Sequence, residues 1–212
     1  QAESHNSNLA EFMDEGELDE IVTELLEAYD GDKESRADWS STYSEGLGLL
    51  GLKNEDRTEP FPGSSGVTHP LLAESVTQFQ AQSYKELFPA GGPVKTQIMG
   101  ATNPMVEAQS SRVKEFMNYQ ISHVMEEYEP ELDQMLFHLP LSGSAFRKIY
   151  FDDKLARPVS KFVSSEDLVV PYDATDLMTC LRITHVIKMP ANDVRKYQVS
   201  GFYRDIDLDD PS

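Results

Sequence analysis

Residues 139–151, LPLSGSAFRKIYF, divide the sequence into two kinds of hydrophobic pattern. Ahead of Ser142 and Gly143, apolar residues recur at the spacing of amphipathic helices. Beyond them, apolar and polar residues alternate with the period of two that is typical of strands. Helices that precede antiparallel strands favour an α+β arrangement over alternating β-α units. We therefore expect an α+β fold, in which N-terminal amphipathic helices and a long helix pack with a small antiparallel β-sheet.

The helical half contains five predicted segments separated by turn-forming residues. They are Glu17–Tyr29, a helix around Arg36–Tyr43, a third from Thr68 to Pro89, a long one from Asn103 to about Glu127, and a last turn or two between Pro130 and Pro140. Residues 30–32, Asp-Gly-Asp, should end the first helix, and the glycines of residues 46–51 should loosen the chain after the second. A loop is expected over residues 59–66 and a short strand over residues 94–99. The long helix is expected to turn inward the residues Val106, Val113, Met117, Ile121, Val124 and Met125.

Four strands are predicted in the second half. They cover Phe146–Phe151, Val159–Val163, Leu168–Val170 and Leu181–Met189, and a short helix around Asn192–Val199 then closes at Gly201. His185 lies on the same strand face as Leu181 and Ile187, so it should point into the core. We favour a hydrogen-bonded core histidine there over a catalytic one.

The negative charge of the chain is concentrated at its two ends. The 212 residues include 37 acidic and 18 basic ones, a net charge of −19, and residues 1–60 alone hold 17 acidic and 4 basic residues. We expect an acidic helical arm at 1–58, an α+β body at 59–202, and an acidic tail at 203–212 that leads to a further C-terminal region. Acidic ends are usually solvated or disordered. The functional alternative is an arm that repels DNA or docks on a basic partner.

Composition excludes several classes of function. Binding DNA through its phosphates needs clustered Lys and Arg, which a sequence pI near 4.5 argues against. No apolar run approaches the length of about 18 residues that a membrane span needs, and no signal peptide opens the chain, so we expect a soluble protein that is not secreted. Cys180 is the single cysteine and can form neither an internal disulfide nor a zinc cluster, which fits a reducing compartment.

No motif with catalytic spacing is present. Residues 63–66, Gly-Ser-Ser-Gly, lack the lysine of a phosphate-binding loop, and the Gly-x-Gly-x-x-Gly spacing of residues 46–51 has no strand ahead of it. His123 and Glu127 could share a metal on one helix face, although a solvated pair is the favoured interpretation. Cys180 has no histidine close in sequence to make it a thiolate. We therefore predict no enzyme and no catalytic, cofactor-binding or metal-binding residues.

The order of several stretches resembles the N-terminal region of bacteriophage portal proteins, of the group typical of short-tailed phages. The resemblance covers roughly residues 35–208. It is carried by Trp39, Tyr43, GLGLLGL at 46–52, PFPGSSGVTHPLL at 60–72, FQAQSYKELFP at 79–89, GPVK at 92–95, FMNYQ at 116–120, LPLSGSAFRK at 139–148, THV at 184–186 and VSGFY at 199–203.

The resemblance implies a structural subunit of a ring, usually of twelve copies, at one capsid vertex of the virion. Such a ring is the conduit for genome packaging and ejection and the platform for terminase and tail attachment. The implied partners are further copies of the chain, the major capsid protein, the scaffolding protein, the terminase large subunit and head-tail adaptor or tail proteins. DNA would pass through without sequence-specific binding, and no membrane is involved. This chain would correspond to the peripheral wing, with the channel-lining and motor-docking residues mostly beyond Ser212.

Two further hypotheses come from other functional classes. One is an acidic scaffold or adaptor that docks a basic partner through residues 1–60, and the other is a small hydrolase that uses His185 or the His123 and Glu127 pair. Trp39, Tyr43 and Phe61 could dock the arm on the body or on a neighbour, or be buried in their own subunit. The main basic pairs of the body could meet a neighbour's acidic arm, although solvation is favoured; they are Arg112, Lys114, Arg147, Lys148, Arg195 and Lys196.

Overall fold

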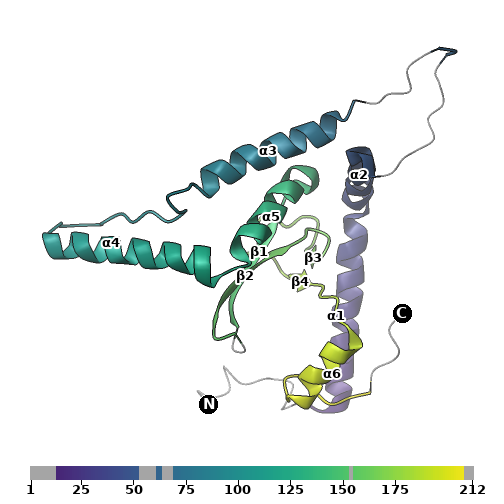
Figure 1. Ribbon diagram of the computed structural model, residues 1–212. Helices are drawn as coiled ribbons and strands as arrows, with labels where there is room; N and C mark the ends of the chain where they lie inside the picture. The colour runs from purple at the N-terminus through teal and green to yellow at the C-terminus, as the bar shows by residue number, and fades with distance from the viewer. Residues whose placement is uncertain (1–12, 53–60, 64–68, 153–154, 208–212) are drawn as a thin grey trace.

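The computed structural model describes residues 13–52, 61–63, 69–152 and 155–207. At its centre, helix α5 (Tyr128–Ser142) packs on a two-stranded sheet of β1 (Phe146–Asp152) and β2 (Arg157–Val163). The remaining helices extend from this centre, with α4 (Pro104–Tyr119) on one side and α1 (Glu15–Ser35) on the other (Figure 1). The order of helices followed by antiparallel strands confirms the predicted α+β class.

Helix α1 starts where the sequence provides its own cap. The Asp14 carboxylate accepts a hydrogen bond from the Glu17 N–H at 2.9 Å, and the Glu17 side chain accepts one in return from the Asp14 N–H. The helix then runs through Gly31, so the predicted end at residues 30–32 is wrong. A helical glycine costs only about 1 kcal/mol, and the buried Asp32 anchors this turn by pairing with Arg182.

Helix α2 (Ala37–Leu47) confirms the second predicted helix, but the chain does not loosen at the glycines that follow. It continues as a π-helical turn, η3 (Gly48–Leu52). Phe61–Gly63 form a turn, and the rest of the predicted loop at 59–66 lies outside the described residues. Helix α3 (Leu71–Leu87) confirms the third helix.

The predicted long helix is divided in the structure. Helix α4 ends at Tyr119 and a π-helical turn, η4 (Gln120–Val124), separates it from α5. Pro130 therefore does not break a helix. It lies in the first turn of α5, where a missing N–H leaves no hydrogen bond unmade. Pro140 lies inside the last turn of α5. Gly143, with φ +78°, caps the end of this helix.

Residues 94–99 do not form the predicted strand, because their polar groups bond to α4 instead. The Asn118 amide accepts from the Val94 N–H at 2.9 Å and donates to the Val94 carbonyl at 3.1 Å. Ser110 Oγ donates to Thr96 Oγ1 at 2.9 Å. These bonds hold the extended segment along one side of the helix.

The strands agree with the prediction except for the last. β1 and β2 pair antiparallel from Phe146 opposite Val163 to Asp152 opposite Arg157. β3 (Leu168–Val169) pairs with β4 (Thr184–His185). The predicted strand over Leu181–Met189 is therefore reduced to two residues, since β3 offers only two residues to pair with it. Helix α6 (Ala191–Val199) confirms the last prediction, and Gly201 follows it with φ +73°.

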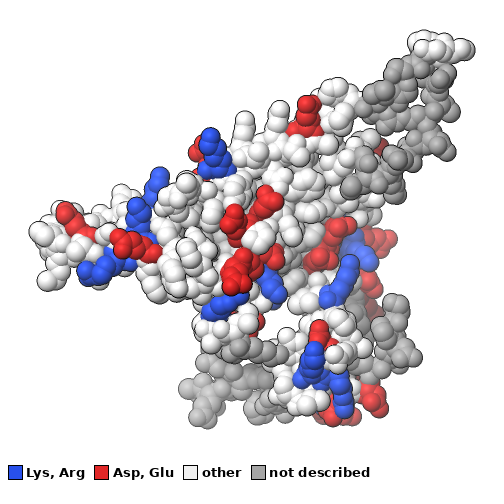
Figure 2. Space-filling model, in the orientation of Figure 1, with Lys and Arg blue, Asp and Glu red and all other residues white. Residues whose placement is uncertain are grey.

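The apolar core is small and lies between α3, α5 and the two sheets. Its fully buried aliphatic side chains are Val76, Leu136, Val159 and Val169. Each contributes about 1.5–3 kcal/mol by leaving water. Within the ranges that the structure describes, no helix is long and apolar enough to cross a membrane. Figure 2 shows that much of the visible surface over α3 carries no charged side chain, whereas both basic and acidic side chains lie along α4.

Candidate functional site

Two carboxylates at the start of α5 hold β2 in place. Glu127 accepts two hydrogen bonds from Arg157, at 2.9 and 2.8 Å, and one from the Ser160 N–H at 3.2 Å. Glu131 accepts from the Phe162 N–H at 2.6 Å. Burial by itself raises the pKa of the Glu127 carboxyl, but hydrogen bonds from its own backbone N–H, Arg157 and Ser160 outweigh burial and lower the pKa below 4.5.

The structure gives Glu127 a structural partner and does not bring His123 to it. His123 is exposed and stacks on Tyr119, with ring centroids 5.3 Å apart. Within the described ranges, no group of three or more His, Cys, Asp or Glu side chains lies close enough together to hold a metal ion. Cys180 Sγ lies 2.8 Å from the Arg182 carbonyl oxygen.

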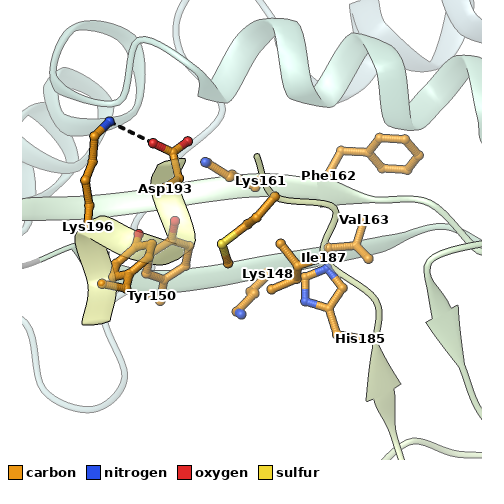
Figure 3. Close-up of a pocket in the computed structure, with 11 residues that line it drawn as sticks. Lys148, Tyr150, Lys161, Phe162, Val163, His185, Ile187, Asp193 and Lys196 are labelled. Atoms are coloured by element: carbon orange, nitrogen blue, oxygen red, sulfur yellow. Dashed lines mark hydrogen bonds and ion pairs between the residues drawn. The ribbon is translucent and has the colours of Figure 1, made fainter. Parts of the chain in front are cut away.

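His185 lies in a pocket of about 560 Å³ between the β1–β2 sheet and α6 (Figure 3). It is half-buried, so its predicted place in the core is wrong: the neighbours expected beside it are open to solvent, with Leu181 88% and Ile187 53% exposed. Burial lowers the pKa of His185, and the positive charge of Lys148 lowers it further, against the opposing effect of Asp167. His185 is therefore biased toward its neutral form.

Three lysines border this pocket. Lys148 and Lys161 occupy directly paired positions of β1 and β2, where like charges repel. Lys196 is bound to Asp193 at 2.8 Å, as the dashed line in Figure 3 marks. The pocket lining includes no serine or cysteine nucleophile. Its chemistry suits the binding of an acidic group.

Helix α2 is joined to the body by two side chains that the sequence singled out, Trp39 and Tyr43. Trp39 Nε1 donates to the Ser142 carbonyl at 3.0 Å, and the buried Tyr43 has its hydroxyl 3.1 Å from His138 Nδ1. Trp39 and Tyr43 thus pack against other residues of their own chain. Phe61 is 64% exposed. Arg36 adds hydrogen bonds to the carbonyls of Ser165, Glu166 and Leu168.

The basic pairs divide between internal and exposed roles. Arg147 donates to the Tyr128 carbonyl at 2.7 Å and lies 4.0 Å from the centre of the Tyr128 ring. Arg195 bonds to Gln198 and to Asp205. Arg112 and Lys114 are both exposed on α4.

Two exposed apolar surfaces lie on α4 and beside α1. The first, the α4 face, consists of Met105, Val113, Phe116 and Met117, which are 78%, 47%, 60% and 42% exposed. Val113 and Met117 were expected to point inward, and that prediction is wrong. The α1 groove is a depression of about 640 Å³ between α1 and the β4 segment, lined mainly by Leu25, Leu26, Tyr29, Ile183 and Val186.

The helical spacing grouped Val113 and Met117 on one apolar stripe of α4, but it gave no sign that they face outward. A stripe indicates that something covers it, and the pattern is the same whether the cover is the same chain or another molecule. Comparison of the sequence with models of known protein families finds no match, and comparison with curated proteins finds none.

Proposed function

We propose that this chain is a structural subunit of a phage portal ring at the capsid vertex, corresponding to the peripheral wing, and that it has no enzymatic role. The ring would serve as the conduit for genome packaging and ejection and as the platform for terminase and tail attachment. The sequence resemblance over residues 35–208 supplies the identity of the assembly. The ring would assemble in the host cytoplasm and act in the virion.

The observation that carries the proposal is the exposure of apolar side chains on two helices that extend from the centre of the molecule. Monomeric soluble proteins rarely expose large contiguous apolar patches, and such patches mark interaction sites. The α4 face and the α1 groove are two such surfaces on one chain. A subunit with a neighbour on each side needs two contact surfaces.

The charge of the chain supports a role beside DNA without binding to it. A conduit that neutralised phosphates would hold the DNA and oppose its movement. A net charge of −19 on each subunit prevents such binding. The partners of the ring would be its own copies, the major capsid protein, the scaffolding protein, the terminase large subunit and head-tail adaptor or tail proteins.

Native mass measurement at low and moderate salt tests the proposal. Subunits of net charge −19 repel one another, and salt screens that repulsion over about 8–10 Å near physiological ionic strength. We expect one discrete species of ring size that is more populated at moderate salt. A monomer at both salt concentrations would contradict the proposal. A compact dimer without larger species would favour the acidic adaptor instead.

A further inference from the structure

We propose that the α4 face of one copy docks into the α1 groove of a second copy, so that identical chains join head to tail. The contact adds an interface to the portal proposal. It rests on that proposal only in one respect, that successive contacts close into a ring. The exposure, shape and charge of the two surfaces support the contact.

Among the described residues of the chain, helix α4 receives little apolar cover. It has 16 residues, and none of them is buried. Most of the stability of a helix in a protein comes from the packing of its apolar face. Asn118 and Ser110 bind residues 94–96 on one side of the helix, and Met105, Val113, Phe116 and Met117 still remain 42–78% exposed.

The α1 groove has the shape that accepts a helix. It lies between a helix and an extended segment, and Leu25 and Leu26 at its rim are 57% and 58% exposed. Amphipathic helices bind such grooves by inserting apolar side chains spaced about one turn apart. Val113, Phe116 and Met117 have this spacing.

One pair of charges beside the two surfaces, Arg112 and Glu24, has opposite signs. Arg112 is exposed next to Val113 and one turn from Phe116 on α4. Glu24 is exposed on α1 next to Leu25. It lies close enough to Arg182, which lines the groove, for its negative charge to favour the charged form of Arg182. Contact between α1 helices of two copies would bring acidic residues together, because Lys33 is the one basic residue among the many acids of this helix. A second copy therefore fits better through α4 than through α1.

The placement of the surfaces determines what kind of assembly results. α4 and α1 lie on opposite sides of the α5 and β1–β2 centre (Figure 1). A contact between different surfaces leaves the α1 groove free on one copy and the α4 face free on the other. Such head-to-tail contacts generate a ring when the rotation closes and an open filament when it does not.

Mixing two single-surface variants tests the contact. Phe116→Asp places a charge in the α4 face and Leu26→Asp places one in the α1 groove, while Met178→Asp alters a 90% exposed apolar residue outside both surfaces as the control. We expect the wild type and the control to assemble, and each surface variant alone to remain monomeric in native mass spectra. An equimolar mixture of the two surface variants should give a dimer with one copy of each and no larger species.

The outcomes separate this contact from the portal proposal. If both surface variants assemble as the wild type does, the contact lies elsewhere and the inference is overturned while the portal proposal stands. Homodimers of the Leu26→Asp variant would show that α4 faces pair with each other, which also overturns it. Open filaments of the wild type that both variants abolish would support the contact and contradict the ring.

A charge exchange provides a second test in which no apolar residue changes. Arg112→Glu and Glu24→Arg each replace an attractive exposed pair with a repulsive one. Each change should therefore lower the association constant at low salt by about tenfold. Both changes in one chain should restore assembly to near the wild-type level. Equal weakening by the single and double variants would overturn the docking of α4 beside Glu24.

Discussion

Arg182 binds Asp32 with two hydrogen bonds, from Nη2 to Oδ1 at 2.8 Å and from Nε to Oδ2 at 3.1 Å. The pair joins residues 150 positions apart in the chain, and it fixes β4 and its neighbouring residues beside the last turns of α1. The hydrogen bonds and the charge of Asp32 raise the pKa of Arg182. The Asp32 side chain is only 7% exposed, so removing Arg182 would leave a buried carboxylate without its bidentate partner.

Loss of this pair should destabilise the protein and disturb the α1 groove. We expect Asp32→Ala to lower the urea midpoint of unfolding clearly, because Arg182 loses its bidentate acceptor. Asp30→Ala is the matched control, since Asp30 is exposed on the same helix two residues earlier, and it should leave the midpoint almost unchanged. Equal midpoints for the two variants would show that the pair does not support the fold.

Substitutions at two adjacent glycines, Gly91 and Gly92, test how much the packing of residues 92–98 on α4 contributes to stability. Gly92 has φ +89°, and a Cβ there would collide with the Asn118 side chain, whereas a Cβ at Gly91 meets nothing within 4 Å. Gly92→Ala should reduce the free energy of unfolding by about 2 kcal/mol. Gly91→Ala should change it by less than about 0.5 kcal/mol. Chemical denaturation of both variants checks the difference, and a Gly92→Ala variant as stable as Gly91→Ala would contradict it.

The Glu127 clamp predicts a specific pH dependence. The folded pKa of Glu127 lies below 4.5, so its ionised form contributes stability above that pH and the contribution is lost as the pH falls through the folded pKa. Glu127→Gln should lose about 1–2 kcal/mol near neutral pH, and the difference from wild type should shrink below about pH 4.5. The exposed Glu126→Gln is the control. A difference that stays constant from neutral to acidic pH would contradict the carboxylate's role.

Tyr84 provides a spectroscopic test at high pH. Its hydroxyl donates to Glu129, and this hydrogen bond, followed by burial and the Glu129 and Asp133 charges, raises the pKa of Tyr84 to about 12. The bond stabilises the fold below the ordinary pKa of about 10, and that contribution is lost as the pH rises through about 12. Glu129→Gln should move the pKa of Tyr84 back toward 10 in an ultraviolet titration, with Tyr84→Phe used to assign the signal. An unchanged titration would contradict the bond.

The sequence predicts the fold best where a local pattern is compatible with only one structure. The alternation of residues 146–151 and 159–163 predicted β1 and β2 because both strands have a partner close in sequence. The same pattern over residues 181–189 failed, because a strand also needs a partner of equal length and β3 has two residues. Asp32 and Arg182 could not be paired from sequence, since nothing local links residues so far apart.

The candidate interaction surfaces show a different limit. Helical spacing correctly grouped Val113 and Met117 on one face, but the expectation that they point inward was wrong. Periodicity reports that a face is apolar, whereas its cover depends on where the connecting turns direct the helix. The π-helical turn of residues 120–124 ends the predicted long helix and directs α4 away from the core.

Electron microscopy of the assembled species tests the central claim, that this chain is a ring subunit, most directly. The account predicts particle images with closed rotational symmetry and a central opening, in which each subunit contacts two neighbours through different surfaces. Images of a compact two-fold dimer, or of open chains without closure, would contradict it.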